Sequence, residues 1–216
     1  MSLELSGTTG LKGVAGSVSA PSIVGDDTNT GISFPAADTI KFSTGGVERM
    51  SITNSGVTGA GGKFASYAVI ADQKSSGTAG GTFVSGDWRV RDLNTELADA
   101  DGIVSISSNQ FTLQAGTYLI KWSCPAYGRS YHASRLRNNT DGINYSGASV
   151  YADYNSNVQN TSIGVARLTI GAAKVFELQH RCANTTNEST AFGVRVGSAF
   201  TVDYEIYTIC EIYKEV

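Results

Sequence analysis

The stretch richest in side chains that could recognise a ligand is 126–160, AYGRSYHASRLRNNTDGINYSGASVYADYNSNVQN. It holds five of the ten tyrosines, mixed with Asn, Ser, Gly and Arg. A tyrosine ring is a rigid contact surface with a polar tip, and Asn and Arg can hydrogen-bond to sugar hydroxyls or carboxylates. The candidate receptor-binding residues are Tyr127, Tyr131, His132, Arg135, Arg137, Asn138, Asn139, Tyr145, Tyr151 and Tyr154. The alternative is an ordinary surface of strands and loops, because residues 135–137 and 149–152 alternate as strands do.

The sequence carries none of the common catalytic motifs. No GxSxG, HExxH, phosphate-binding loop or dinucleotide fingerprint occurs in the sequence. A glycosidase needs two paired carboxylates, but the acids cluster in the terminal strand and in 92–101 without aromatic neighbours arranged like a sugar groove. We expect that the chain is not an enzyme and needs no cofactor.

Two further polar groups have structural interpretations. Asp99 and Asp101, with Asp92, could bind calcium, but they lack the spacing of a calcium-binding loop and read as a solvated acidic turn. His180 shares a strand face with Phe176 and predicts a hydrogen-bonded structural imidazole rather than a base. We expect no metal site.

Composition favours β structure. Of 216 residues, 25 are Gly, and Tyr and Phe together supply 18 rings, whereas helix-forming Glu, Lys, Gln and Arg are sparse. The net charge of −3 gives no attraction to nucleic acid or to an anionic membrane. No apolar run approaches the ~20 residues of a membrane span. The N-terminus lacks the pattern of a secretory signal, so we expect assembly in a cytoplasm.

The three cysteines are odd in number and widely spaced, which suits neither a disulfide framework nor a zinc site of the CxxC type. Each lies in an apolar alternating stretch. We predict that Cys124, Cys182 and Cys210 are buried thiols.

The clearest core segment is Phe111–Cys124, which predicts two short strands joined at Ala115-Gly116. Tyr118, Ile120, Trp122 and Cys124 fall on one face, and Leu119, Lys121 and Ser123 on the other. Further strands are predicted at 67–71, 83–91, 103–106, 165–170, 175–182, 191–196 and 202–213, with an exposed loop at 92–101. About eight to ten strands at this spacing favour a sandwich or jelly roll.

The last predicted strand, 202–213, alternates throughout. Its second face mixes acids with aromatic and apolar residues, which is unusual for open solvent and favours a contact between subunits. The trimer-interface candidates on this face are Tyr207, Ile209 and Tyr213.

Residues 1–62 differ from the rest, and Gly56–Gly62 (GVTGAGG) predicts a boundary before residues 63–216. The first part lacks Tyr, Trp and Cys and has short apolar dyads between turns, too short for a core of their own. Such a chain can order if copies wrap round each other. The alternative is a flexible linker.

Residues 21–52, PSIVGDDTNTGISFPAADTIKFSTGGVERMSI, resemble a segment of tailed-bacteriophage fibres and related virion proteins, through the DTNTGI turn, Pro-Ala-Ala-Asp and TGGVERM. The resemblance implies an intertwined trimeric shaft or collar that attaches to the virion ahead of a globular head. One copy of the segment is present, so any shaft is short.

The order of YAVIADQKSSGTAGGTFVSGDWRVRDLNTE, SNQFTLQAGTYLIKWSCPAY, KVFELQHRC and VDYEIYTICEIYKEV resembles a C-terminal domain of phage fibre and tail proteins. Its organisation is similar to trimeric jelly rolls of the tumour-necrosis-factor and complement-globular-head class. The resemblance covers about 150 residues and implies a jelly-roll head with its terminal strand at the trimer core. No collagen-like Gly-X-Y stalk is present.

Together these observations predict an all-β homotrimer with a short intertwined N-terminal segment and a C-terminal jelly-roll β-sandwich. The expected function is a structural tail fibre or fibre tip of a virion, binding a host-surface glycan or protein without inserting into the membrane. A capsid or neck decoration protein with the same trimeric fold is the alternative, and a soluble cytokine-like or lectin-like bacterial protein is a third reading.

Overall fold

The structure is a computed structural model. It describes residues 4–6, 10–12, 15–59, 64–128, 130–151, 158–185, 188–197 and 199–215. Every regular element in these ranges is a β-strand, so the all-β prediction is confirmed for them. The chain divides into two compact units, Met1–Gly62 and Lys63–Val216. None of the described residues belongs to a helix long and apolar enough to cross a membrane.

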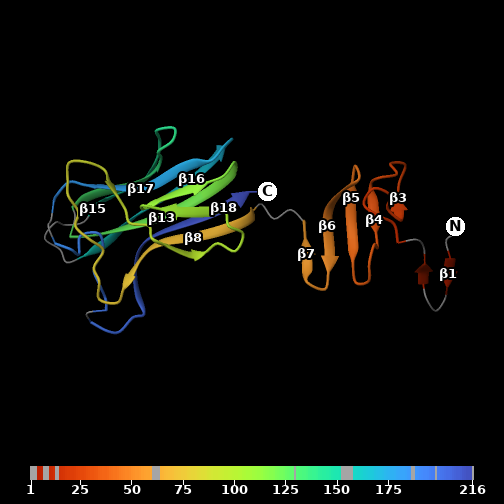
Figure 1. The fold of residues 1–216 in the computed structure, drawn as a ribbon, viewed down its shortest axis with the longest axis horizontal. Helices are drawn as coiled ribbons and strands as arrows, with labels where there is room; N and C mark the ends of the chain where they lie inside the picture. Colours follow the sequence, from red (N-terminus) through yellow and green to blue (C-terminus); the bar gives the residue numbers. More distant parts are fainter. Residues whose placement is uncertain are drawn as a thin grey trace. The chain divides into compact units, whose positions relative to one another are not determined.

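The first unit contains two antiparallel sheets. One is a hairpin and the other is a five-stranded meander in which each strand pairs with the next in sequence (Figure 1). The strands are β1 (Glu4–Ser6), β2 (Gly10–Lys12), β3 (Ile23–Val24), β4 (Gly31–Ser33), β5 (Ile40–Thr44), β6 (Val47–Thr53) and β7 (Gly56–Thr58).

The apolar dyads of the first unit pair with one another across the meander. Phe42 of β5 lies opposite Ile32 of β4 and Met50 of β6, and Ile40 lies opposite Ile52. Cross-strand apolar pairs of this kind stabilise a sheet. Residues 23–58 therefore form a sheet rather than a linker, with every strand paired inside one chain. Intertwining with other copies stays a prediction.

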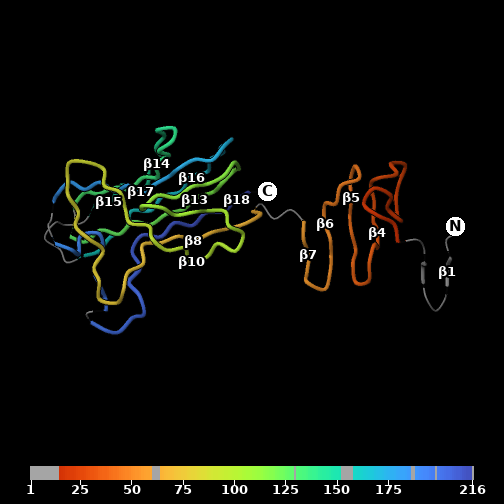
Figure 2. The backbone as a smooth tube through the Cα atoms, viewed as in Figure 1, coloured from red at the N-terminus to blue at the C-terminus, as the bar shows by residue number. Residues whose placement is uncertain are grey.

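The second unit is a sandwich of two antiparallel sheets (Figures 1 and 2). The first sheet has the order β10-β8-β18-β13-β16; the second has the order β11-β12-β17-β14-β15, with β9 paired to β17. The strands are β8 (Phe64–Ser75), β9 (Arg89–Val90), β10 (Thr95–Ala98), β11 (Val104–Ser107), β12 (Gln110–Leu113), β13 (Gly116–Tyr127), β14 (Tyr131–Asn138), β15 (Ile143–Tyr151), β16 (Gln159–Ile170), β17 (Lys174–Cys182) and β18 (Tyr204–Glu215).

The eight principal strands follow a jelly-roll order. Strands β8, β18, β13 and β16 make one sheet and β12, β17, β14 and β15 make the other, so that the chain passes repeatedly from sheet to sheet. This strand order confirms the jelly-roll prediction for the second unit. The C-terminal strand β18 is central in its sheet, between β8 and β13.

The core lies between the sheets and follows the predicted alternation of β13. Tyr118, Ile120, Trp122 and Cys124 are all buried there, together with apolar residues of both sheets. The Trp122 indole also donates a hydrogen bond to Ser134 Oγ on the opposite sheet, 2.9 Å away. The two strands predicted in Phe111–Cys124 are confirmed as β12 and β13, which belong to different sheets.

All three cysteines are buried thiols outside any disulfide, as predicted. Burial raises the pKa of the Cys124 thiol to about 11 and raises the pKa of the Cys210 thiol well above its ordinary value. Both thiols behave as small core residues because their charged forms are penalised by desolvation.

Three element predictions are wrong. In 83–91 only Arg89–Val90 is a strand, and the rest is a loop that crosses the end of the sandwich. Residues 92–101 contain strand β10, which pairs with β8, and the carboxylate of Asp99 accepts hydrogen bonds from the backbone of Ile103 and Val104. Residues 191–196 form turns rather than a strand. Contacts with neighbouring strands, rather than local pattern, decide these segments.

Strand β18 departs from strict alternation at a bulge. Its pairing with β8 shifts between Ile206 and Ile209, so that Tyr207 and Thr208 both face the core. Tyr207 is only 5% exposed and donates a hydrogen bond to Thr78 O at 2.7 Å. Its burial raises the pKa of the phenol. The prediction of Tyr207 as an interface residue is therefore wrong, because a bulge reverses the faces of a strand.

Candidate functional site

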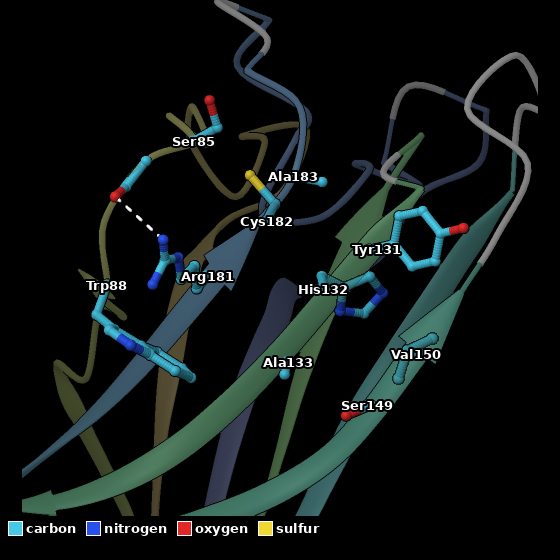
Figure 3. A pocket seen from close by; sticks show the side chains of 11 residues that line it. Ser85, Trp88, Tyr131, His132, Ala133, Ser149, Val150, Arg181, Cys182 and Ala183 are labelled. Carbon is cyan, nitrogen blue, oxygen red and sulfur yellow. Dashed lines mark hydrogen bonds between the residues drawn. The ribbon is translucent and has the colours of Figure 1, made fainter.

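A groove of about 550 Å³ opens at one end of the second sheet (Figure 3). Strands β14, β15 and β17 form it together with the loop before β9. The residues that line it are Ser85, Gly86, Trp88, Tyr131, His132, Ala133, Ser149, Val150, Arg181, Cys182 and Ala183. In Figure 3, Trp88 and Arg181 lie on one side, and Tyr131 and Val150 on the other.

The groove exists because the small residues Ala133 and Ser149 lie between the large side chains of Trp88 and Tyr131. The strand register places Ala133 of β14 directly between Arg181 of β17 and Ser149 of β15. Directly opposite residues of one sheet share a face. The next row on that face begins with Tyr131. A shallow floor of alanine and serine is thus bounded by an aromatic row.

The aromatic side of the groove is a cross-strand tyrosine pair. Tyr131 lies opposite Tyr151 in the register of β14 and β15, and the ring centroids are 4.8 Å apart with the planes tilted by 43°. Both rings are unusually exposed, at 63% and 62% of their surface. Exposed tyrosines on a strand pair present flat apolar area to solvent, which is a feature of binding surfaces rather than of a core.

The opposite wall is the loop carrying Trp88, which is fixed at several points. Phe83 is buried, with its ring 4.5 Å from that of Phe192. Ser85 hydrogen-bonds to Thr185 Oγ1 through both its backbone N–H and its hydroxyl. The guanidinium of Arg135 lies over the Trp88 ring, 4.1 Å from the ring centroid. These contacts hold a loop in the way that a preorganised binding site requires.

A buried histidine pair lies under the floor. His132 Nδ1 and His180 Nε2 are 2.9 Å apart, so one ring donates to the other. His132 Nε2 and His180 Nδ1 have no hydrogen-bond partner among the described atoms. One of these two nitrogens carries a proton and the other a lone pair, whichever tautomers are present. The prediction of a hydrogen-bonded His180 is confirmed, with His132 as its partner.

The histidine pair is held in its neutral form. Burial lowers the pKa of His132 to about 4 and the pKa of His180 well below its ordinary value, and the charge of Arg91 acts in the same direction. Arg91 is itself fully buried. Its guanidinium donates to Thr208 Oγ1, Pro125 O and Phe192 O, at 2.7, 3.1 and 2.9 Å. A second positive charge beside it is unfavourable.

The electrostatic character of the groove is set by Arg181. Among the eleven described lining residues, it is the one with a charged side chain, and none is Asp or Glu. Its Nη2 donates to Gly86 O at 3.4 Å. No group of three or more His, Cys, Asp or Glu in the described part of the chain is placed to hold a metal ion.

Three sequence-predicted candidates line the groove or its rim, and a fourth supports its wall. Tyr131 and His132 line it, Tyr151 pairs with Tyr131, and Arg135 stacks on Trp88. His132 is 4% exposed, and its side chain faces the core on the opposite side of the sheet from Tyr131 and Ala133, where it contacts His180. Its prediction as a receptor contact is corrected on that ground.

Most other candidates lie elsewhere. Arg137 donates hydrogen bonds to Asn139 and Asn144, and Asn139 donates to Glu177 at 2.6 Å, further along the same sheet face. Asn138 is buried, because its side chain caps the turn through Asp141. Its prediction as a surface contact is corrected on that ground.

The remaining tyrosine candidates are also outside the groove lining. Tyr145 packs against the core, and the backbone N–H of Tyr127 at the end of β13 donates to Ala191 O. Tyr154 lies outside the described residues. The tyrosines of 126–160 therefore lie in several different environments, and not all of them belong to one binding site.

The sequence did not reveal the contributions of Trp88, Arg181 and the Ser85-Gly86 turn. They reach the groove from segments remote in the chain, through the pairing of β9 and β14 with β17. The available signal was the tryptophan in a predicted strand that also held two arginines, since an arginine can stack on an indole.

A second surface is the outward face of the first sheet. Two of its rows are Ala71, Ile209, Ser123 and Ile163, and Tyr67, Tyr213, Leu119 and Arg167. A third row between them is Val69, Glu211, Lys121 and Val165. Ile163 and Val165 are 59% and 61% exposed. The predicted interface residues Ile209 and Tyr213 lie on this face.

No model of a protein family matches the chain, and no curated protein does. The structure is similar to the globular domain of zebrafish complement 1qA protein, at 14% identity and a TM-score of 0.43, over 68% of this chain and 95% of that one. It is also similar to murine APRIL, at 8% identity and a TM-score of 0.41, over 69% of this chain and 98% of that one. Likenesses at this level carry no function across.

Proposed function

We propose that the chain is a non-enzymatic structural protein of a tailed-phage virion, a homotrimeric tail fibre or fibre tip whose jelly-roll head binds the host cell surface. The observation that carries the binding role is the groove: an exposed pair of tyrosines faces a fixed tryptophan and an arginine across a floor of small residues. Flat aromatic rings with hydrogen-bond donors between them suit a sugar. The virion origin rests on the resemblance of residues 21–52.

Trimer formation is supported by the outward face of the first sheet. Exposed Ile163, Val165 and Tyr67 stand there beside Ile209 and Tyr213. Lys121 and Glu211 lie among them, in the same row as Val165. Exposed apolar side chains gathered on one sheet face support an interaction surface. The groove is on the other sheet, so a trimer built through this face leaves three grooves open. Weak binding at each becomes strong collectively, because later contacts form at high effective concentration.

Binding without cleavage is supported by the groove lining. Glycoside hydrolysis uses two carboxylic groups flanking the scissile bond. None of the described lining residues is an acid. The first unit serves to hold the head on other virion proteins, and neither nucleic acid nor a cofactor has a part in this function.

The alternative is a capsid or neck decoration protein that uses the same trimer and grips the shell through residues 1–62. Gold-labelled antibody against the head on intact virions separates the two. Label at the tail tip supports adsorption, whereas label over the head replaces it with decoration. Purified protein should also compete with virions for host cells, and failure to compete would count against the adsorption role.

A further inference from the structure

We propose that the groove binds a sugar bearing a carboxylate, with Arg181 pairing to the carboxylate and Tyr131 packing on the sugar ring. The inference deepens the proposed function and rests on it.

The charge of the groove selects an anion. Arg181 provides the charged side chain among the described lining residues, on a protein whose net charge is −3. The Arg135 guanidinium lies behind the wall on the Trp88 ring, where the charges of Asp87 and Glu177 act on it together with those of Arg137 and Arg181. The carboxylate of Asp87 accepts from the Trp88 backbone N–H and is directed to that turn. An acidic ligand is favoured over a neutral or cationic one.

The guanidinium of Arg181 has capacity for a ligand. Arginine has five N–H donors in a planar fork that matches the two oxygens of a carboxylate. In the described part of the chain, Arg181 makes one hydrogen bond, to Gly86 O, and at 3.4 Å it is long. The side chain is exposed. In Figure 3 the guanidinium is directed toward the loop that carries Trp88, at the edge of the groove.

The shape of the groove selects a sugar rather than a simple anion. About 550 Å³ exceeds what an isolated carboxylate fills and lies in the range of small-molecule sites. Ala133 and Ser149 leave room beside the Tyr131 ring for the apolar face of a pyranose. A sugar acid joins the two features, namely a flat apolar face for Tyr131 and a carboxylate for Arg181.

The test is titration by saturation-transfer NMR of the full chain with two matched pairs, glucuronate against glucose and galacturonate against galactose. We expect at least one acid to bind about tenfold more tightly than its neutral parent, the size of effect of one charge-assisted pair. Arg181→Gln should abolish that preference, and Arg181→Lys should keep part of it. Arg49→Gln, which removes the same charge from β6 of the first unit, should keep it whole.

Two results would overturn the inference: neither acid exceeding its parent, or Arg181→Gln retaining the preference. If the neutral sugars bind as well as the acids and Tyr131→Ala weakens both, the carboxylate assignment fails while glycan binding stands. If glucose 6-phosphate alone binds through Arg181, a phosphate replaces the carboxylate and the inference is likewise wrong. Loss of competition for host cells would instead remove the proposed function.

Discussion

The guanidinium carbon of Arg135 lies 4.1 Å from the centroid of the Trp88 ring, with the cation over the aromatic face. Arg135 Nε also donates to Gln179 Oε1 at 2.7 Å, which fixes the guanidinium against β17. Arg135 of β14 thus fixes the loop that carries Trp88, although the two segments are distant in the sequence. The position of one groove wall depends on this contact.

Replacing Arg135 with alanine should loosen Trp88 without unfolding the head. A partly exposed cation–π contact contributes about 1 kcal/mol, so the loss in unfolding free energy should be of that order. Trp88 fluorescence should shift to the red, and host-cell adsorption should weaken about tenfold because the wall moves. Arg49→Ala, in the first unit, is the matched control. An unshifted emission spectrum together with full adsorption would contradict the role given to Arg135.

Replacing Tyr131 with alanine should weaken adsorption more directly, since it removes the ring on which a ligand packs. Aromatic anchors at binding sites contribute about 2 kcal/mol, which predicts a loss of more than tenfold at one site and a larger loss in a multivalent assay. Phe200→Ala removes a ring that is 62% exposed outside the groove lining and should have no effect. Equal adsorption of the two variants would exclude the groove as the binding site.

The His132–His180 pair predicts a loss of stability on acidification. Unfolded histidine has a pKa near 6.5, whereas burial lowers the pKa of folded His132 to about 4. Between these values the unfolded chain binds protons that the folded chain does not, so unfolding free energy falls as pH falls from about 6.5 to about 4. His132 alone accounts for about 3 kcal/mol over this window, and His180 adds in the same direction.

Urea unfolding at pH 7 and pH 5 measures this dependence. The double variant His132→Gln, His180→Gln removes both titrating groups while keeping polar side chains, and its stability should change much less between the two pH values. If the wild type and the double variant show the same pH dependence, other groups are responsible and the neutral pair is not the acid-sensitive element.

Thiol reagents should label Cys124 and Cys210 slowly, because both residues are buried in the core. The raised pKa values of Cys124 and Cys210 keep both thiols protonated at pH 8, and burial blocks access. We expect both to react with a disulfide reagent only at the rate of unfolding, measured by mass spectrometry of labelled peptides. Rapid labelling of either residue in native protein would contradict their burial in the core between the two sheets.

The alternation of residues within single strands predicted much of the fold of residues 63–216. The alternation of Tyr118, Ile120 and Trp122 placed β13 correctly because one face of that strand is fully in the core. The same reasoning failed in β18, where a bulge turns Tyr207 inward. A bulge depends on how the partner strand β8 pairs, which a single strand's pattern does not contain.

The candidate site could be predicted only in part. Tyr131 and Tyr151 were found from composition, because binding loops favour such residues, whereas His132 faces the core. Trp88 and Arg181 were missed, since they join the groove only through sheet pairing between distant segments. Asn138 was misassigned because an Asn can close a turn as readily as it can face a ligand.

The outward face of the first sheet can be tested by a single charge. Val165→Asp places a carboxylate in the exposed apolar face, and a charge buried in a subunit contact is costly. We expect this variant to be folded but monomeric. Ile143→Asp, at a residue 47% exposed on β15 of the other sheet, is the matched control and should assemble as the wild type does.

Static light scattering of the wild-type protein at micromolar concentration tests the account most directly, because both avidity and the role of the outward face require a trimer. The predicted mass is three times the chain mass of 22.6 kDa, falling to a single chain in Val165→Asp. A wild-type mass of one chain at that concentration would contradict the trimeric head and the multivalent binding built on it.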